Sequence, residues 1–199
     1  MKRVVLCFLF VMTTVTVVRA QQFRFGVATG VDAARLSISG ATGGPLKVKT
    51  DVAGGISGEA VISKLFAVQL EVNYSSQGTG VISGDGTTAG SYQFSYITVP
   101  LLAKLYGTPE LSFFAGPQLG LLMKAKVKSS TSADTDVKDM LEKSDFYAVF
   151  GSEYRFKNGV FIGARYNAGL DNIVKDKTSN SKLQNHYISL RLGYSFGLK

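Results

Sequence analysis

Residues 66–75 read FAVQLEVNYS, and every second side chain of this stretch is apolar. The large apolar residues alternate with small or polar ones: Phe66, Val68, Leu70, Val72 and Tyr74 against Ala67, Gln69, Glu71, Asn73 and Ser75. Successive side chains of a β-strand point to opposite faces, so this alternation predicts a strand with one apolar and one polar face. Beyond the first 20 residues the chain has neither an apolar run of about 18 residues nor a sustained helical period.

The same alternation recurs along the rest of the chain. Eight such stretches cover approximately residues 22–33, 50–62, 65–76, 91–106, 110–124, 144–156, 159–171 and 185–197. The composition agrees, because the 22 Gly, 13 Phe and 9 Tyr residues favour strands and turns over helices. The sequence therefore predicts an all-β chain of eight strands.

The connections between the predicted strands alternate in length. Short ones lie near 63–64, 107–109 and 157–159, and long polar ones at about 33–49, 76–91, 125–143 and 171–185. The last short connection fits a three-residue hairpin that has Gly159 in the left-handed conformation and pairs Phe156 with Val160. All four long loops fall at one end of the strands and both termini at the other. This arrangement predicts an antiparallel up-and-down β-barrel.

The polar face of the strands carries long charged side chains of both signs, interspersed with glycines. The charged residues are Arg24, Glu59, Glu71, Lys104, Glu153, Arg155, Arg165 and Arg191. The interior of an eight-stranded barrel is just wide enough to be filled by side chains. Buried charges need partners of the opposite sign, and mixed signs supply them. We therefore expect these eight residues to form a charge network that plugs the barrel interior.

The apolar face is almost free of charge, and its aromatic residues gather near the strand ends. We place Phe23, Phe25, Phe66, Tyr106, Tyr154, Phe156, Tyr194 and Phe196 near the short turns, and Tyr74, Phe94 and Phe146 toward the loops. Aromatic belts at both lipid–water interfaces are typical of transmembrane barrels. A secreted lipocalin-like carrier, with an apolar interior and a wet exterior, is the alternative. The uniform apolar face predicts a monomer surrounded by outer-membrane lipid.

The N-terminus has the pattern of a secretory signal peptide. Lys2 and Arg3 precede the apolar stretch 4–18, and Val18-Arg19-Ala20 supplies a cleavage site. We expect residues 1–20 to be removed and residues 21–199 to form the barrel domain. The only cysteine, Cys7, lies early in the apolar stretch, whereas a lipoprotein cysteine follows that stretch. Since Cys7 would be removed with residues 1–20, we expect the mature chain to have neither disulfides nor thiolate chemistry.

Four motifs resemble those of the Bacteroidetes-type outer-membrane β-barrel family, also called porin-family or PorT-like proteins. They are YITVPLLAK at 96–104, FAGPQLG at 114–120, RYNAGLDNI at 165–173 and LGYSF at 192–196. The resemblance implies an eight-stranded barrel in a Gram-negative outer membrane, inserted by the barrel assembly machinery. The chain departs from the pattern after Phe196, because such barrels often end on the final aromatic residue and here three residues follow it.

Residues suited to catalysis or metal binding are sparse. The single histidine, His186, falls on the outward face near the loops, whereas Ser189 points the other way. In the third long loop Asp134, Asp136, Asp139 and Glu142 lack the spacing of a Ca²⁺ loop, and lysines interleave with them. The net charge of +8 is scattered, with no Lys/Arg-rich run for nucleic acid. The sequence predicts no enzyme, no cofactor and no metal site.

Taken together, these features predict a non-enzymatic integral outer-membrane protein with a structural or binding role. Its four long extracellular loops would contact any ligand or protein partner, whose identity the sequence leaves open. Two further hypotheses stay open beside the lipocalin-like carrier. One is a narrow porin-like channel for ions or small solutes, and the other is an enzyme at the barrel rim that acts on lipid through His186.

Overall fold

A computed structural model describes residues 22–39, 46–82, 88–129, 135–171 and 182–198. Within these ranges lie eight long strands: β1 (Gln22–Ser39), β2 (Leu46–Val61), β3 (Phe66–Ile82), β4 (Thr88–Tyr106), β5 (Leu111–Ser129), β7 (Ser144–Arg155), β8 (Val160–Gly169) and β9 (Lys182–Leu198). The short strand β6 (Thr135–Asp136) and the 3₁₀ helix η2 (Lys138–Met140) lie between β5 and β7. The predicted signal peptide lies outside the described residues.

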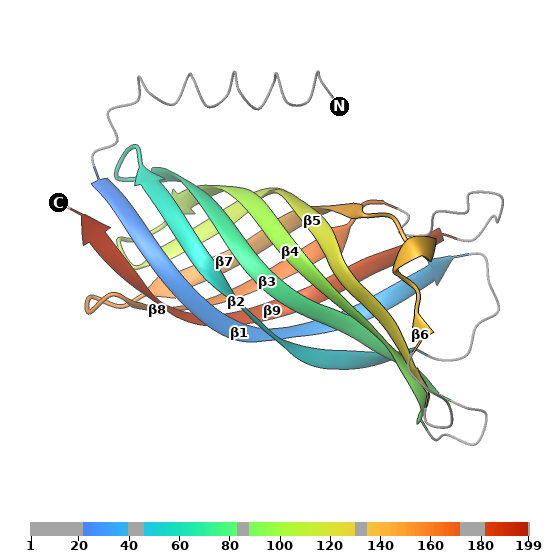
Figure 1. The fold of residues 1–199 in the computed structure, drawn as a ribbon. Helices are drawn as coiled ribbons and strands as arrows, with labels where there is room; N and C mark the ends of the chain where they lie inside the picture. Colours follow the sequence, from blue (N-terminus) through green and yellow to red (C-terminus); the bar gives the residue numbers. More distant parts are fainter. Residues whose placement is uncertain (1–21, 40–45, 83–87, 130–134, 172–181, 199) are drawn as a thin grey trace, which may run out of the picture.

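The eight long strands form one closed sheet (Figure 1). Strand β1 pairs with both β2 and β9, and the β4–β5 pairing completes the ring through β3, β7 and β8. Every neighbouring pair is antiparallel. Closure satisfies the backbone hydrogen bonds without leaving an open edge, as a strand structure in hydrocarbon must. The predicted eight-stranded up-and-down barrel is confirmed.

Each long strand turns its large apolar side chains outward. In β7, Tyr147, Val149 and Glu153 are buried, while the intervening Phe146 and Phe150 are exposed. The exposed residues of the other strands include Val27, Ile56, Leu70, Leu101, Phe113, Ile162 and Leu190. The buried polar and charged residues lie on the opposite face. The barrel is therefore apolar outside and polar inside. Among the described residues, no helix has the length and apolar character needed to cross a membrane.

The short turns and both ends of the described chain lie at one end of the barrel, on the left of Figure 1. The turn between β7 and β8 has the predicted geometry. The Phe156 amide donates to the Val160 carbonyl at 2.8 Å, the Gly159 amide donates to the Phe156 carbonyl at 3.0 Å, and Gly159 has a φ of 92°. A positive φ of this size favours glycine, which has no Cβ to clash with its own backbone. The predicted hairpin is confirmed.

At the loop end, β1 to β5 are longer than the alternation predicts. Strand β3 continues to Ile82 rather than 76, β4 begins at Thr88, and β5 continues to Ser129. Pairs such as Gln77–Phe94 and Gly80–Ser91 keep the ladder intact there. In the extensions of β3 and β4, Gly, Ser, Thr and Gln predominate, so the apolar alternation fades there while backbone hydrogen bonding, which does not depend on side-chain polarity, continues. The predicted boundaries of these two strands were wrong for this reason. In β1 and β2 the alternation continues through Leu36, Ile38, Leu46 and Val48, and the prediction ended it too early.

Two aromatic residues of β4 were assigned to the wrong face. Tyr106 and Phe94 are both buried inside the barrel instead of standing in the outer belts. Even-numbered residues of this strand point inward together with Lys104, and the strand period places both aromatics on that face. Near Phe94 the register with β5 shifts, since Ser95 pairs with Lys124 and Tyr96 with Leu122. An extra residue of β5 is accommodated at this β-bulge.

Candidate functional site: the barrel interior and its turn-end mouth

The interior near the short turns is built around the carboxylate of Glu59 in β2. Arg24 Nη1 donates to it at 2.8 Å, Lys104 Nζ at 2.9 Å and Arg155 Nη2 at 2.8 Å. The hydroxyl of Tyr106 adds a fourth hydrogen bond at 2.5 Å. These donors come from three strands, so Glu59 on β2 is linked to β1, β4 and β7 inside the barrel.

Lys104 is fully buried, and its ammonium group has three acceptors. They are Glu59 Oε2, Gln69 Oε1 and Glu153 Oε1, each at 2.9 Å. An ammonium group has three N–H donors, so all three are satisfied. Arg155 Nη2 also donates to Glu153, at 2.8 Å. We refer to Arg24, Glu59, Lys104, Glu153 and Arg155 as the turn-end cluster.

Farther along the barrel axis, Arg165 of β8 and Glu71 of β3 form a bidentate ion pair. The Nη1–Oε2 and Nη2–Oε1 distances are 2.7 Å and 3.1 Å. Gln69 and Asn73 donate to the two oxygens of Glu71 at 2.6 Å and 2.9 Å. The guanidinium of Arg165 also lies 5.2 Å from the centre of the Phe114 ring. Since β3 and β8 are not neighbours in the sheet, this pair spans the lumen.

A third group of polar contacts surrounds Asp32 of β1. Arg191 Nη2 donates to Asp32 Oδ1 at 3.2 Å, and the Ser189 hydroxyl donates to the same oxygen at 2.6 Å. The Ser75 hydroxyl donates to the other oxygen, Oδ2. Asp32 was not among the eight charged residues chosen from the sequence, although the alternation of β1 places it on the same face as Arg24. Its position on that polar face was the signal that could have identified it.

The structure places all eight charged residues chosen from the sequence on the inner face, each with an oppositely charged partner. The space left between Glu71, Arg165 and Arg191 has a volume of about 10 Å³. A cavity of this size holds about one water molecule. The Cβ that any other residue would have at Gly169, in the motif at 165–173, would lie 2.4 Å from the Asn185 carbonyl oxygen. Gly169 is therefore required by close packing of the β8 and β9 backbones.

At the loop end, an apolar cluster lies inside the barrel. Phe94 and Tyr96 of β4 and Leu122 and Ala125 of β5 are buried there, and Leu141 packs against them from the β5–β7 connection. The segment that carries Leu141 also contains β6, which pairs with β5 at Lys126 and Val127. Residues 135–141 of this connection therefore pack against β4 and β5 at the loop end. We refer to these five residues as the loop-end cluster.

The residues considered for catalysis lie on opposite faces of β9. His186 stacks on the outward Tyr166, with ring centres 6.3 Å apart, whereas Ser189 is buried inside beside Asp32. In the acidic segment, Asp136 Oδ1 accepts a hydrogen bond from the Lys138 amide at 2.9 Å. Asp134 lies outside the described residues. No group of three or more His, Cys, Asp or Glu side chains suited to a metal ion occurs in the described part of the chain.

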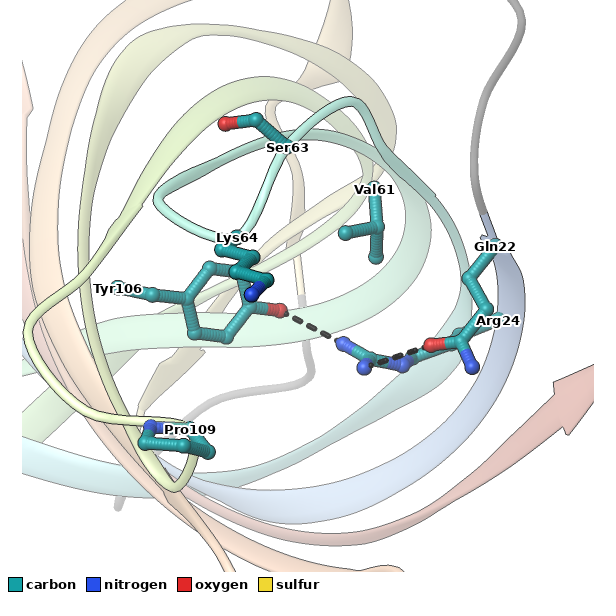
Figure 2. Close-up of a pocket in the computed structure, with 7 residues that line it drawn as sticks. All are labelled: Gln22, Arg24, Val61, Ser63, Lys64, Tyr106 and Pro109. Atoms are coloured by element: carbon teal, nitrogen blue, oxygen red, sulfur yellow. Dashed lines mark hydrogen bonds between the residues drawn. The ribbon is translucent and has the colours of Figure 1, made fainter.

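A pocket of about 390 Å³ opens at the turn end of the barrel (Figure 2). Its lining comes from β1, β2, β4 and the two adjoining turns: Gln22, Arg24, Val61, Ser63, Lys64, Tyr106 and Pro109. Figure 2 shows the Arg24 guanidinium held between the Gln22 side-chain oxygen, at 3.1 Å, and the Tyr106 hydroxyl, at 3.0 Å. We call this pocket the turn-end mouth. The alternation of strand residues did not predict it, because turn residues contribute part of its lining.

Solved structures of other outer-membrane proteins share this fold. Neisserial surface protein A matches with a TM-score of 0.56 and 15% identity over 86% of this chain and 97% of that one. Ail, the attachment invasion locus protein of Yersinia pestis, solved with the heparin analogue sucrose octasulfate, matches with a TM-score of 0.52 and 14% identity over 88% of this chain and 99% of that one. At such identities the likeness is one of fold.

No curated protein sequence matches the chain at a significant level. The model of one protein family, described as "Outer membrane protein beta-barrel domain", matches residues 19–175. Those residues include seven of the eight long strands and all but one of the charged residues chosen from the sequence. The match to this family model and the apolar exterior of the barrel both support a location in the outer membrane of the cell. The chain belongs to the outer-membrane protein β-barrel domain family.

Proposed function

We propose that this outer-membrane protein is a closed, non-catalytic barrel with a structural or binding role. The observation that carries the proposal is the side-chain packing of the interior, where three groups of ion pairs lie and the space between Glu71, Arg165 and Arg191 measures only about 10 Å³. The loop-end cluster adds an apolar layer above them. A barrel closed in this way is a rigid support, and the surface it presents at its loop end would carry out recognition.

The ion pairs favour a plug over an ion path. Charged side chains that line an ion path must exchange hydrogen-bond partners readily as ions pass. Lys104 instead has a fixed acceptor for each of its three N–H donors. Removing one member of a buried ion pair leaves an uncompensated charge, at a cost of about 3–5 kcal/mol. Opening the lumen would break several such pairs together. The narrow porin-like channel is therefore the second hypothesis.

Conductance of the purified protein in planar lipid bilayers separates the two hypotheses. We expect the natural chain to be silent at all voltages. The double variant Glu71→Ala with Arg165→Ala removes one pair that spans the lumen without leaving a lone charge. Because the turn-end cluster and the loop-end cluster remain in place, we expect this variant to stay silent as well. Ile162→Ala, which shortens an outward side chain on β8, is the control and should stay silent. Regular conductance steps from the natural chain would support the channel instead.

The remaining hypotheses have separate tests. A lipocalin-like carrier needs an apolar cavity, and the polar interior together with the outer-membrane location does not fit one. A rim enzyme that uses His186 would change the cellular lipid profile, so unaltered lipids after His186→Ala would exclude it. Residues 1–20 are proposed as a cleaved signal peptide, and N-terminal sequencing of the mature protein at Gln21 tests this.

The finer family relationship is also a proposal. The motifs at 96–104, 114–120, 165–173 and 192–196 support kinship with the Bacteroidetes-type, PorT-like barrels of Gram-negative bacteria. Outer-membrane lipid would surround the barrel, and the assembly machinery would insert it as a monomer. Depletion of that machinery should lower the amount of folded protein in the outer membrane, while an unchanged amount would argue against its use.

A further inference from the structure

The turn-end mouth differs from the rest of the interior because it opens to solvent beside a surplus of positive charge. The turn-end cluster contains three cations, Arg24, Lys104 and Arg155, and two carboxylates, Glu59 and Glu153. Lys64 adds a further positive charge at the rim of the mouth. The other turns at this end contribute Glu110 and Lys157, which offset each other, and neither lines the pocket.

Arg24 is the group best placed to bind a ligand in the mouth. The side chain of Arg24 is 25% exposed to solvent, whereas that of Lys104 is fully buried. Its bonds to Gln22, Glu59 and Tyr106 use three N–H donors, and a guanidinium has five. The planar guanidinium fits the two oxygens of a carboxylate. Gln22 has already positioned it at the pocket wall (Figure 2).

The other walls of the pocket carry polar and apolar groups that suit the backbone and side chain of a small peptide. The Gln22 oxygen accepts from Arg24, which leaves the amide nitrogen of Gln22 as a donor. Val61 and Pro109 supply apolar surface for a small side chain. A volume of about 390 Å³ lies within the range of roughly 300–1,000 Å³ that is usual for small-ligand sites. The pocket thus combines a carboxylate-binding group, a rim cation, an amide donor and an apolar wall.

We propose that the turn-end mouth binds the C-terminal carboxylate of a peptide chain, with Arg24 and Lys64 facing the carboxylate. Short turns face the periplasm in barrels of this kind, so the peptide would come from the periplasmic side. This site goes beyond the proposed function, which concerns the closed lumen and the loop end.

Titration of the purified full chain in detergent micelles with trialanine tests the proposal, with chemical shifts of turn-end amides as the readout. Trialanine amide, which lacks the carboxylate charge, should bind about tenfold more weakly, as expected for loss of a charge-assisted hydrogen bond. Lys64→Gln should weaken trialanine binding about three- to fivefold. Lys157→Gln makes the same charge change on another turn that does not line the pocket, and it should leave binding within twofold.

Three outcomes would overturn the proposal. They are the absence of trialanine binding, equal binding of the amide, and an equal loss in the Lys64→Gln and Lys157→Gln variants. Neither lysine is part of the buried network, so both variants should fold like the natural chain. The conductance experiment tests the closed lumen and does not depend on the turn-end mouth. A titration without trialanine binding would therefore overturn only the peptide site, and ion conductance would overturn only the closed lumen.

Discussion

The ion pair between Arg165 and Glu71 joins β8 to β3 across the lumen, so its two charges stabilise contact between strands that share no backbone hydrogen bonds. Both side chains are buried, and Gln69 and Asn73 complete the hydrogen bonding of the carboxylate. A buried ion pair of this kind adds little stability compared with apolar residues of the same size. Removing only one of its two charges is costly, because the other charge stays buried without a partner.

We therefore expect Arg165→Ala to lower the free energy of unfolding by about 3–5 kcal/mol, because Glu71 would remain buried and unpaired. Urea unfolding of the protein in lipid vesicles measures this. The double variant with Glu71→Ala should lose less than the single one. Lys157→Ala on an exposed turn should stay within about 0.5 kcal/mol of the natural chain. An Arg165→Ala variant as stable as the natural chain would contradict a buried, compensated network.

Alternation identified inward positions well wherever long charged residues occupied them. It placed Asp32 on the polar face as well, but the predicted charge network left this residue out, because its partners Ser75, Ser189 and Arg191 come from strands distant in sequence. Tyr106 was placed outside because aromatic residues were assigned to belts by type. In the structure its hydroxyl donates to Glu59, and the period of β4 gives the correct face.

Among the strands and turns, the connections at the turn end were predictable and those at the loop end were not. Short turns have strong local requirements, as at Gly159, whose conformation depends on residue type. The loop-end extensions of β3, β4 and β5 depend on pairing with neighbouring strands, which leaves little trace in the side chains of a polar segment. The contact between Leu141 and the barrel interior likewise joins residues from three elements.

Gly159→Val should destabilise the β7–β8 hairpin. A side chain at φ 92° is strained by about 1–3 kcal/mol, and its Cβ would also lie 2.9 Å from the Ser195 carbonyl oxygen of β9. The same urea unfolding experiment measures the loss. Gly58→Ala is the control, because its added Cβ would meet only the Phe23 ring, at 3.7 Å, so a small effect is expected. Equal losses in both variants would show that the turn conformation is unimportant.

At the scale of the whole molecule, the fold inverts the arrangement of a soluble barrel. Apolar and aromatic side chains of all eight long strands are exposed, while the eight charged residues predicted for the interior have oppositely charged partners there. Paired outer aromatics such as Tyr194 and Phe196, with ring centres 4.7 Å apart, stand near the turn end. The amphipathic pattern alone allowed either orientation of the faces. Charges interspersed with glycines decided it, because a narrow interior needs both small residues and compensated charges.

The orientation of the two faces is the central claim, and the absence of tryptophan from the chain makes it directly measurable. Neighbouring residues Phe113 and Phe114 are 54% and 6% exposed, and Leu121 and Leu122 form a second such pair near the loop end. Each of the four is replaced singly by Trp, and its fluorescence is recorded in vesicles with brominated lipid chains. We predict strong quenching for Phe113→Trp and Leu121→Trp and little for Phe114→Trp and Leu122→Trp. The reverse order, or equal quenching within both pairs, would contradict a barrel that is apolar toward lipid and polar within.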